Sequence, residues 1–249
     1  MVSEKTNWSG LFMEDQWRFV YLLGGAATIL VLISILVDVV IGNISGGNIT
    51  LLPVTAAERY GQLRQSPLIG LYNLDLLNLI NQIILIFGYF AVAGALRKTN
   101  LPLALLGLIF YLVATSVFIT NSPALPMLDL SNKYALSTDS LKNLYSAAGE
   151  AILARGEHGS PGFLPGFFLP NIGSLILSAA MLDGKVFSSK VAWIGIAGSV
   201  LLMAYTLLVT FVPVVKEMAT AFSMPGGLLM MAWMILYTIR LLKLAKKSD

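Results

Sequence analysis

The chain has 249 residues, of which 57% are hydrophobic and 12% charged, with a formal net charge of +3 and a mean hydropathy of +0.79. The charged share is about half that of an ordinary soluble domain, and several runs of about 20 residues carry almost no charge, so a soluble globular protein is excluded and a membrane protein is predicted. The absence of cysteine excludes disulfides, thiolate catalysis and cysteine-held metal or iron–sulfur sites.

Six apolar segments follow one another along the chain. They predict an all-α, polytopic transmembrane helix bundle in a single membrane domain, because each segment is long enough, at about 1.5 Å per residue, to cross a hydrocarbon core of about 30 Å. The predicted spans are residues 17–42, 67–96, 101–120, 163–182, 190–215 and 222–244. Acidic residues precede the first segment and its apolar run is too long for a signal peptide, so we expect it to be retained.

The connections differ in character. The Gly/Asn/Ser-rich stretch GNISGGNITLLP after the first span reads as a loop. The long polar region between spans 3 and 4, residues 123–158, is predicted to hold an amphipathic helix on the outer face, because apolar side chains recur at helical spacing behind Ser137 and Thr138. Its apolar positions are Leu141, Leu144, Tyr145, Ala148 and Ile152. This segment is either a solvated cap or a lid that brings Glu150, Arg155 and His158 to a site.

Lysine and arginine indicate the orientation. Ten of the 16 basic residues fall in the two terminal segments and in the second-to-third and fourth-to-fifth connections. They are Lys5, Arg18, Arg97, Lys98, Lys185, Lys190, Arg240, Lys243, Lys246 and Lys247. Since short flanks rich in Lys and Arg stay in the cytoplasm, we predict a multi-pass protein of the cell membrane with both termini cytoplasmic. The basic C-terminal segment reads as a membrane-edge anchor, and no nucleic-acid partner is expected.

The second span carries an unusual polar stripe. On a helical wheel Asp75, Asn78 and Gln82 fall within about 60° of one another. Because an ionisable side chain in lipid costs several kcal/mol, this face is expected to look into the bundle. Asp38 in the first span and Asn171 in the fourth would lie in the same outer layer.

Three interpretations of this layer stay open. It forms an outward-facing polar pocket for a small amphipathic or cationic ligand, it is hydrogen-bonding glue between helices, or it moves protons or ions. Gly195 and Ser199, four residues apart, predict a close helix contact. No internal repeat relates the two halves of the chain, which weakens a transporter interpretation.

Several enzyme classes lack their residues. His158 is the single histidine, so a multi-histidine metal site and bis-histidine haem ligation are excluded. Neither HExxH nor GxSxG occurs, and the glycine pairs lack the Lys-Ser/Thr of a phosphate loop. We therefore predict no metal and no cofactor, and an enzyme is not favoured.

Several strings are familiar in combination: YNLDLLNLINQ, then NSPALPMLDLSNKYA followed after a short gap by SAAGEAILA, then KVFSSKVAWIGIAGSV. In this order they resemble the bacterial and archaeal six-span membrane family catalogued as domain of unknown function 4386, over most of the chain. The resemblance implies a prokaryotic multi-pass helical protein and brings no established activity, substrate or cofactor. Asn73, Asp75 and Glu150 fall in its strings without an assigned role, and the stretch GEHGSPGFLPGFF around His158 departs from it.

Three functions remain as hypotheses. The first is ligand binding in the outer pocket around Asp75. The second is a non-catalytic accessory or assembly subunit that meets another membrane protein. The third is a membrane enzyme in which Asp38, Asp75, Glu150 and His158 supply acid–base groups.

Overall fold

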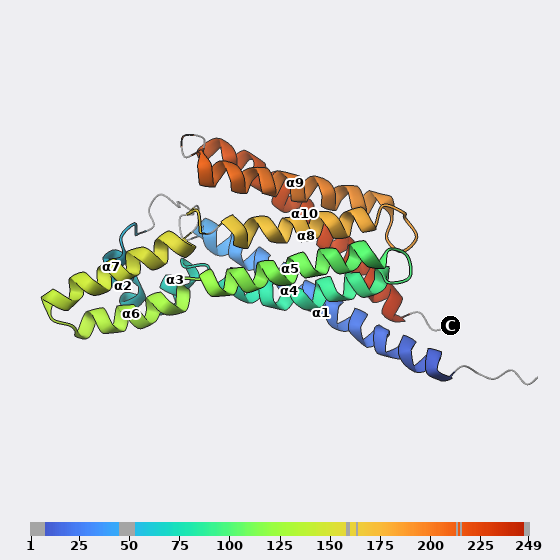
Figure 1. Cartoon of the computed structure of the whole chain (residues 1–249), viewed down its shortest axis with the longest axis horizontal. Coiled ribbons are helices and arrows are strands. Elements are labelled where there is room, and N and C mark those ends of the chain that lie inside the picture. Colours follow the sequence, from blue (N-terminus) through green and yellow to red (C-terminus); the bar gives the residue numbers. More distant parts are fainter. Residues whose placement is uncertain are drawn as a thin grey trace, which may run out of the picture.

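The computed structural model describes residues 8–44, 53–157, 160–162, 164–212, 214 and 216–246, and within them the secondary structure is entirely helical. Six helices form a bundle: α1 (Trp8–Ile44), α4 (Leu76–Leu96), α5 (Leu101–Asn121), α8 (Leu164–Ala180), α9 (Ser189–Phe211) and α10 (Lys216–Lys246). Four more gather at one end of it, as Figure 1 shows: α2 (Ala56–Gln65), α3 (Pro67–Tyr72), α6 (Ala124–Leu136) and α7 (Asp139–Gly156). We call these four helices the head.

The predicted all-α class is confirmed, and five bundle helices, α1, α4, α5, α9 and α10, have the length and composition of membrane spans. α8 is apolar but has 17 residues, about 25 Å of helix. That is shorter than a hydrocarbon core of about 30 Å. Crossing by α8, and with it the count of six spans, stays a prediction.

The segment expected as one span, residues 67–96, is divided in two. α3 ends at Tyr72, a turn follows, and α4 begins at Leu76. The sequence is apolar on both sides of this break, so hydropathy does not detect it. Because of the break, Asp75 of the polar stripe lies at the end of a bundle helix rather than inside it.

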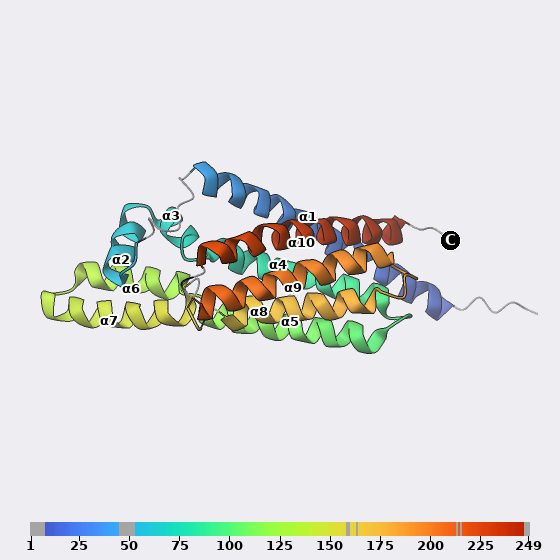
Figure 2. The same cartoon turned by 90° about the horizontal axis from the view of Figure 1, so that it is seen from above.

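The bundle helices contact one another in the cyclic order α1, α4, α5, α8, α9, α10 and back to α1. Figure 2 shows them running side by side. Glycines set the closest contacts, as is usual between membrane helices. A Cβ on Gly24 of α1 would stand 2.7 Å from the carbonyl oxygen of Phe87 on α4. A Cβ on Gly195 of α9 would stand 2.6 Å from the Trp233 ring on α10, so the predicted close contact at Gly195 is confirmed.

Aromatic side chains fill the middle of the bundle. Tyr89 of α4 stacks on Tyr111 of α5 with ring centroids 3.6 Å apart, and Trp233 of α10 packs edge-on between Tyr89 and Tyr237 at 6.0 and 4.8 Å. All four side chains are buried. Tyr237 also shares a hydrogen bond with Thr28 of α1 at 3.2 Å, so this aromatic core ties the first helix to the last.

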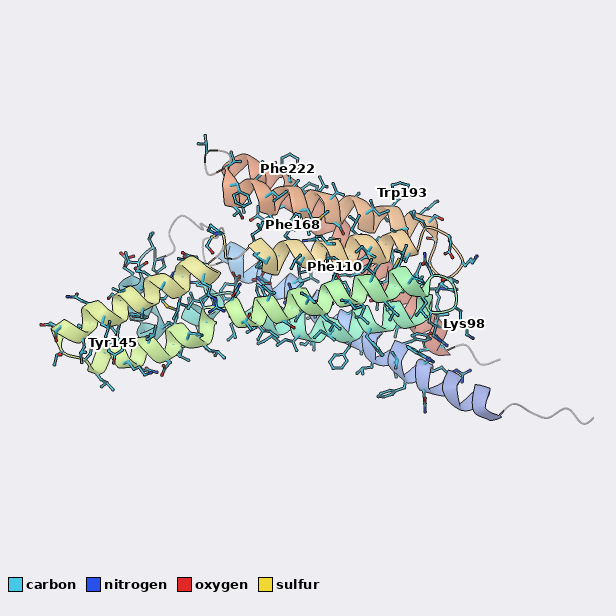
Figure 3. All side chains as sticks on the ribbon, viewed as in Figure 1. Lys98, Phe110, Tyr145, Phe168, Trp193 and Phe222 are labelled. Atoms are coloured by element: carbon cyan, nitrogen blue, oxygen red, sulfur yellow. The ribbon has the colours of Figure 1, made fainter. Side chains whose placement is uncertain are left out.

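The two ends of the molecule differ in charge and structure. The 97–100 and 181–188 connections and the C-terminal end of α10 lie together at the end opposite the head. Figure 3 shows Lys98 at this basic end and Tyr145 in the head. The predicted orientation requires the basic connections to share one end, and the fold meets that condition.

The head has a core of its own, built from Tyr60 and Leu63 of α2, Met127 of α6 and Leu153 of α7, together with Ala56, Leu74 and Ala124. The segment 123–158 was expected to hold one amphipathic helix, but its described residues form two, α6 and α7. The face buried by α7 also differs from the expectation. It consists of Gly149, Leu153 and Gly156, whereas Leu141 and Leu144 are exposed.

Candidate functional site

Asp75 stands at the junction between head and bundle, in an uncommon backbone conformation. Its φ of 61° and ψ of 23° place it in the left-handed region, and it is the one non-glycine residue with positive φ among the described residues. Aspartate and asparagine tolerate this region better than other non-glycine residues. An aspartate at position 75 therefore suits the sharp turn from α3 into α4.

The two carboxylates of the predicted layer flank Tyr72 at the end of α3. The Tyr72 hydroxyl donates a hydrogen bond of 2.5 Å to Oδ1 of Asp38, and Asp75 lies within electrostatic range of both Tyr72 and Tyr205 of α9. Asp38 therefore anchors α3 to the end of α1.

The amides of the predicted site bond locally. Nδ2 of Asn78 donates to Oδ1 of Asp75 at 3.0 Å, and Nδ2 of Asn171 donates to the carbonyl of Phe167, one turn back on its own helix, at 2.7 Å. Oε1 of Gln82 is buried and has no hydrogen-bond partner among the described residues.

The cavity that Asp75 lines is small. It lies against the ends of α5 and α7 and the start of α8, and its volume is about 10 Å³, which admits about one water molecule. Asp75 and Asn78 lie together, and the cavity that Asp75 lines among the described residues is of water size.

Arg155, a predicted lid residue, joins α7 to the end of α5. Its Nε donates to Oδ1 of Asn121 at 2.8 Å, and its Nη2 donates to the carbonyl of Thr120 at 2.7 Å. Asn121 in turn donates from Nδ2 to the carbonyl of Gly162 at 3.1 Å. This chain of bonds fixes the head to the bundle at the point where α8 begins.

Glu150, the other predicted lid residue within the described part, joins α7 to α2. Its carboxylate accepts a hydrogen bond of 2.6 Å from the first free backbone N–H of α2, that of Ala56, where the helix dipole favours negative charge. Beside it the Tyr60 hydroxyl donates to the carbonyl of Tyr145 at 2.8 Å. Burial, with a smaller effect of Glu150, raises the pKa of Tyr60 to about 12, so this donor keeps its proton at neutral pH.

An ion pair that the sequence did not reveal completes the head. Nη2 of Arg59 lies 2.7 Å from Oε1 of Glu157, with side chains 3% and 35% exposed. Nε and Nη1 of Arg59 are buried with no partner among the described residues. The sequence does contain a signal for the helix that carries Arg59. Thr55 and Glu58 form a reciprocal capping box at the start of α2, and a Thr-x-x-Glu pattern is typical of a helix start.

Two glycines test how closely α2 and α7 pack. A Cβ on Gly149 would stand 2.6 Å from Cβ of Ala56, whereas one on Gly61 would meet nothing within 4 Å. We expect Gly149→Ala to destabilise the head by about 1–3 kcal/mol through overpacking, and Gly61→Ala to stabilise it by about 0.5–1 kcal/mol through helix propensity. Hydrogen exchange of the α2 amides measures both. Equal effects of the two substitutions would contradict this close packing.

His158 lies outside the described residues, and within those residues no group of three or more His, Asp or Glu side chains could hold a metal ion. Asp38 and Glu150, two of the proposed acid–base groups, are engaged by Tyr72 and by the Ala56 N–H. Comparison of the chain with protein-family models, with curated proteins and with solved structures finds no match.

Proposed function

We propose that the chain is a six-span membrane protein that works as a non-catalytic accessory or assembly subunit, holding its head at the outer face for a partner protein. One observation carries this proposal: five of the residues predicted to bind a ligand or form a lid make contacts that fix structure. They are Asp38, Asn78, Glu150, Arg155 and Asn171. A rigidly mounted head suits recognition of a partner better than opening and closing over a substrate.

The tip of the head offers a surface for such a partner. Leu136 at the end of α6 is 90% exposed and Leu144 on α7 is 62% exposed. The turn between α6 and α7 lies at the far end of the head from the bundle (Figure 1), and the proposal places this end outside the bilayer. Contiguous exposed apolar patches, rather than single exposed leucines, are typical of protein contact sites, and the proposal takes these two leucines as parts of one such patch.

A small-molecule site around Asp75 is the second candidate. The left-handed backbone of Asp75 favours it, and so does the buried oxygen of Gln82, which has no partner among the described residues. Strained and unsatisfied groups gather at functional sites. With a cavity of about 10 Å³, an organic ligand would enter only if the head moved away from the bundle.

Native mass spectrometry of the protein, extracted gently from its own membranes, separates these functions. We expect a co-purifying protein in the wild type and in Asp75→Asn, a change that keeps a residue tolerant of the left-handed region. We expect its loss from Leu136→Glu/Leu144→Glu, while Gln65→Glu, an exposed α2 position of the head, retains it.

Two results would contradict the proposal. A small-molecule adduct present in the wild type and missing from Asp75→Asn, without a co-purifying protein, would establish the ligand site instead. A strict monomer in all four samples would remove the accessory-subunit function.

A further inference from the structure

A cavity lies at the end of the bundle opposite the head. It has a volume of about 360 Å³, is open on one side, and is lined by the 184–188 connection, the start of α9 and the last turns of α10. This volume falls in the range of about 300–1,000 Å³ typical of sites for small ligands. No residue of the proposed head surface or of the Asp75 junction contributes to it.

Three basic side chains line this cavity: Lys185 from the connection and Arg240 and Lys243 from α10. Arg240 and Lys243 are three residues apart and so lie on one face of the helix. Nε of Arg240 donates a hydrogen bond of 2.6 Å to the carbonyl of Val186. This bond holds the guanidinium at the cavity wall, and the described residues provide no partner for its two amino groups, which can therefore meet an anion.

Acidic side chains offset little of this charge. Oδ2 of Asp183 lies 3.8 Å from Nζ of Lys185 in an exposed ion pair. Asp183 itself does not line the cavity. Within the described part of the chain, neither Arg240 nor Lys243 forms an ion pair. A fixed guanidinium beside an ammonium group is a favourable arrangement for the oxygens of a phosphate group.

The cavity also borders the apolar surface of the spans. Leu236 and Ile239, which share its wall with Arg240, are 37% and 46% exposed, and Trp193, one half-turn beyond the lining residue Val191 on α9, is 62% exposed. Figure 3 shows the Trp193 ring on the outer side of α9 near this end. Tryptophan at the end of a span is typical of the level of the lipid headgroups. Basic pockets between helices at this level bind anionic headgroups.

We propose that this cavity binds the phosphate headgroup of an anionic phospholipid through Arg240 and Lys243, with Lys185 at its rim. The acyl chains of the lipid extend along Leu236 and Ile239 into the bilayer. The shared chemistry is a phosphate group, which free phosphate also offers, but the apolar side chains continuous with the basic wall favour a lipid. The site is independent of the proposed partner-binding function of the head.

Lipid titration of the full chain in detergent, followed by native mass spectrometry, tests the site. We expect phosphatidylglycerol to form a saturable adduct and phosphatidylcholine, whose choline the basic wall repels, to bind more weakly. Arg240→Gln/Lys243→Gln is expected to weaken phosphatidylglycerol binding about 30-fold, as for two basic contacts to an anionic lipid. The control Lys190→Gln/Lys246→Gln removes the same charge from the same end without touching the cavity, and we expect less than a twofold change.

Loss of Arg240 could also disturb the 184–188 connection, because Arg240 is hydrogen-bonded to the carbonyl of Val186. A single substitution of Lys243 separates this effect from loss of lipid binding. Lys243→Gln keeps that bond, and we expect about fivefold weaker binding. The proposal is overturned if both double variants lose binding equally, if the two lipids bind alike, or if Lys243→Gln binds as the wild type does. Displacement of phosphatidylglycerol by millimolar inorganic phosphate would assign the cavity to a soluble phosphate compound instead.

Discussion

Replacing Glu157 with alanine is expected to destabilise the head by about 3 kcal/mol while leaving the bundle intact. The physical reason is the partner left behind: Arg59 is 3% exposed, and Glu157 provides its one described ion pair. A buried cation without its anion costs more than the pair ever contributed. Since Glu157 is 35% exposed, water compensates in part, and the lower end of the usual range applies.

Because this chain has no cysteine, a single introduced cysteine can be labelled without background and its labelling rate measured. Ser131 in α6 and Ser199 in α9 are buried, so Ser131→Cys reports opening of the head and Ser199→Cys opening of the bundle through their rates of thiol labelling. Glu157→Ala should accelerate labelling at position 131 on the order of 100-fold and leave position 199 unchanged.

Two further variants show whether burial is the cause. Asp129→Ala breaks the exposed ion pair with Lys133 and should cost less than about 0.5 kcal/mol. Arg59→Leu/Glu157→Leu removes both charges and should restore most of the lost protection. If Glu157→Ala behaved like Asp129→Ala, the Arg59–Glu157 pair would not be what holds α2 to α7.

The bundle could be predicted from the sequence because lipid imposes a simple rule. A span must be apolar over its whole length, and this leaves a mark that hydropathy alone detects. The head follows no such rule. α2 is short and polar, and its ties to α7 run from Ala56 to Glu150 and from Arg59 to Glu157, 94 and 98 residues apart. Single-sequence periodicity carries no signal for pairs at that separation.

The buried face of α7 shows a second limit. The spacing of leucines predicted a face through Leu141 and Leu144, but the helix buries Gly149, Leu153 and Gly156. Where two helices approach closely, the small residue is what permits contact. A search for apolar periodicity therefore overlooks the contact positions that glycine supplies.

The predicted polar stripe was only partly informative about the site. Asp75 and Asn78 do contact each other, as a shared helix face suggested. The wheel, however, assumed one continuous helix through residues 67–96, and the left-handed turn at Asp75 interrupts it. A single residue in an uncommon conformation thus moves the carboxylate from the interior of a span to its end.

Replacing Gly173 with alanine is expected to lower the stability of the bundle by about 2–3 kcal/mol through overpacking. The added Cβ would stand 2.8 Å from the carbonyl oxygen of Gly107 and 3.1 Å from the backbone nitrogen of Tyr111, both on α5. Backbone atoms cannot rotate aside as a side chain can, so α5 and α8 must separate. The stacked pair of Tyr111 and Tyr89 then loses its packing as well.

Gly227→Ala is the matched control, since a Cβ there would meet nothing within 4 Å and alanine favours the helix. Thermal unfolding in detergent should show a midpoint roughly 5–10 °C lower for Gly173→Ala, from the usual 2–4 °C per kcal/mol at this size, and an unchanged or higher midpoint for Gly227→Ala. Equal midpoints would mean that α5 and α8 adjust without cost. The aromatic core would then not depend on their close approach, and α8, the shortest bundle helix, would be a looser neighbour than its glycine contact implies.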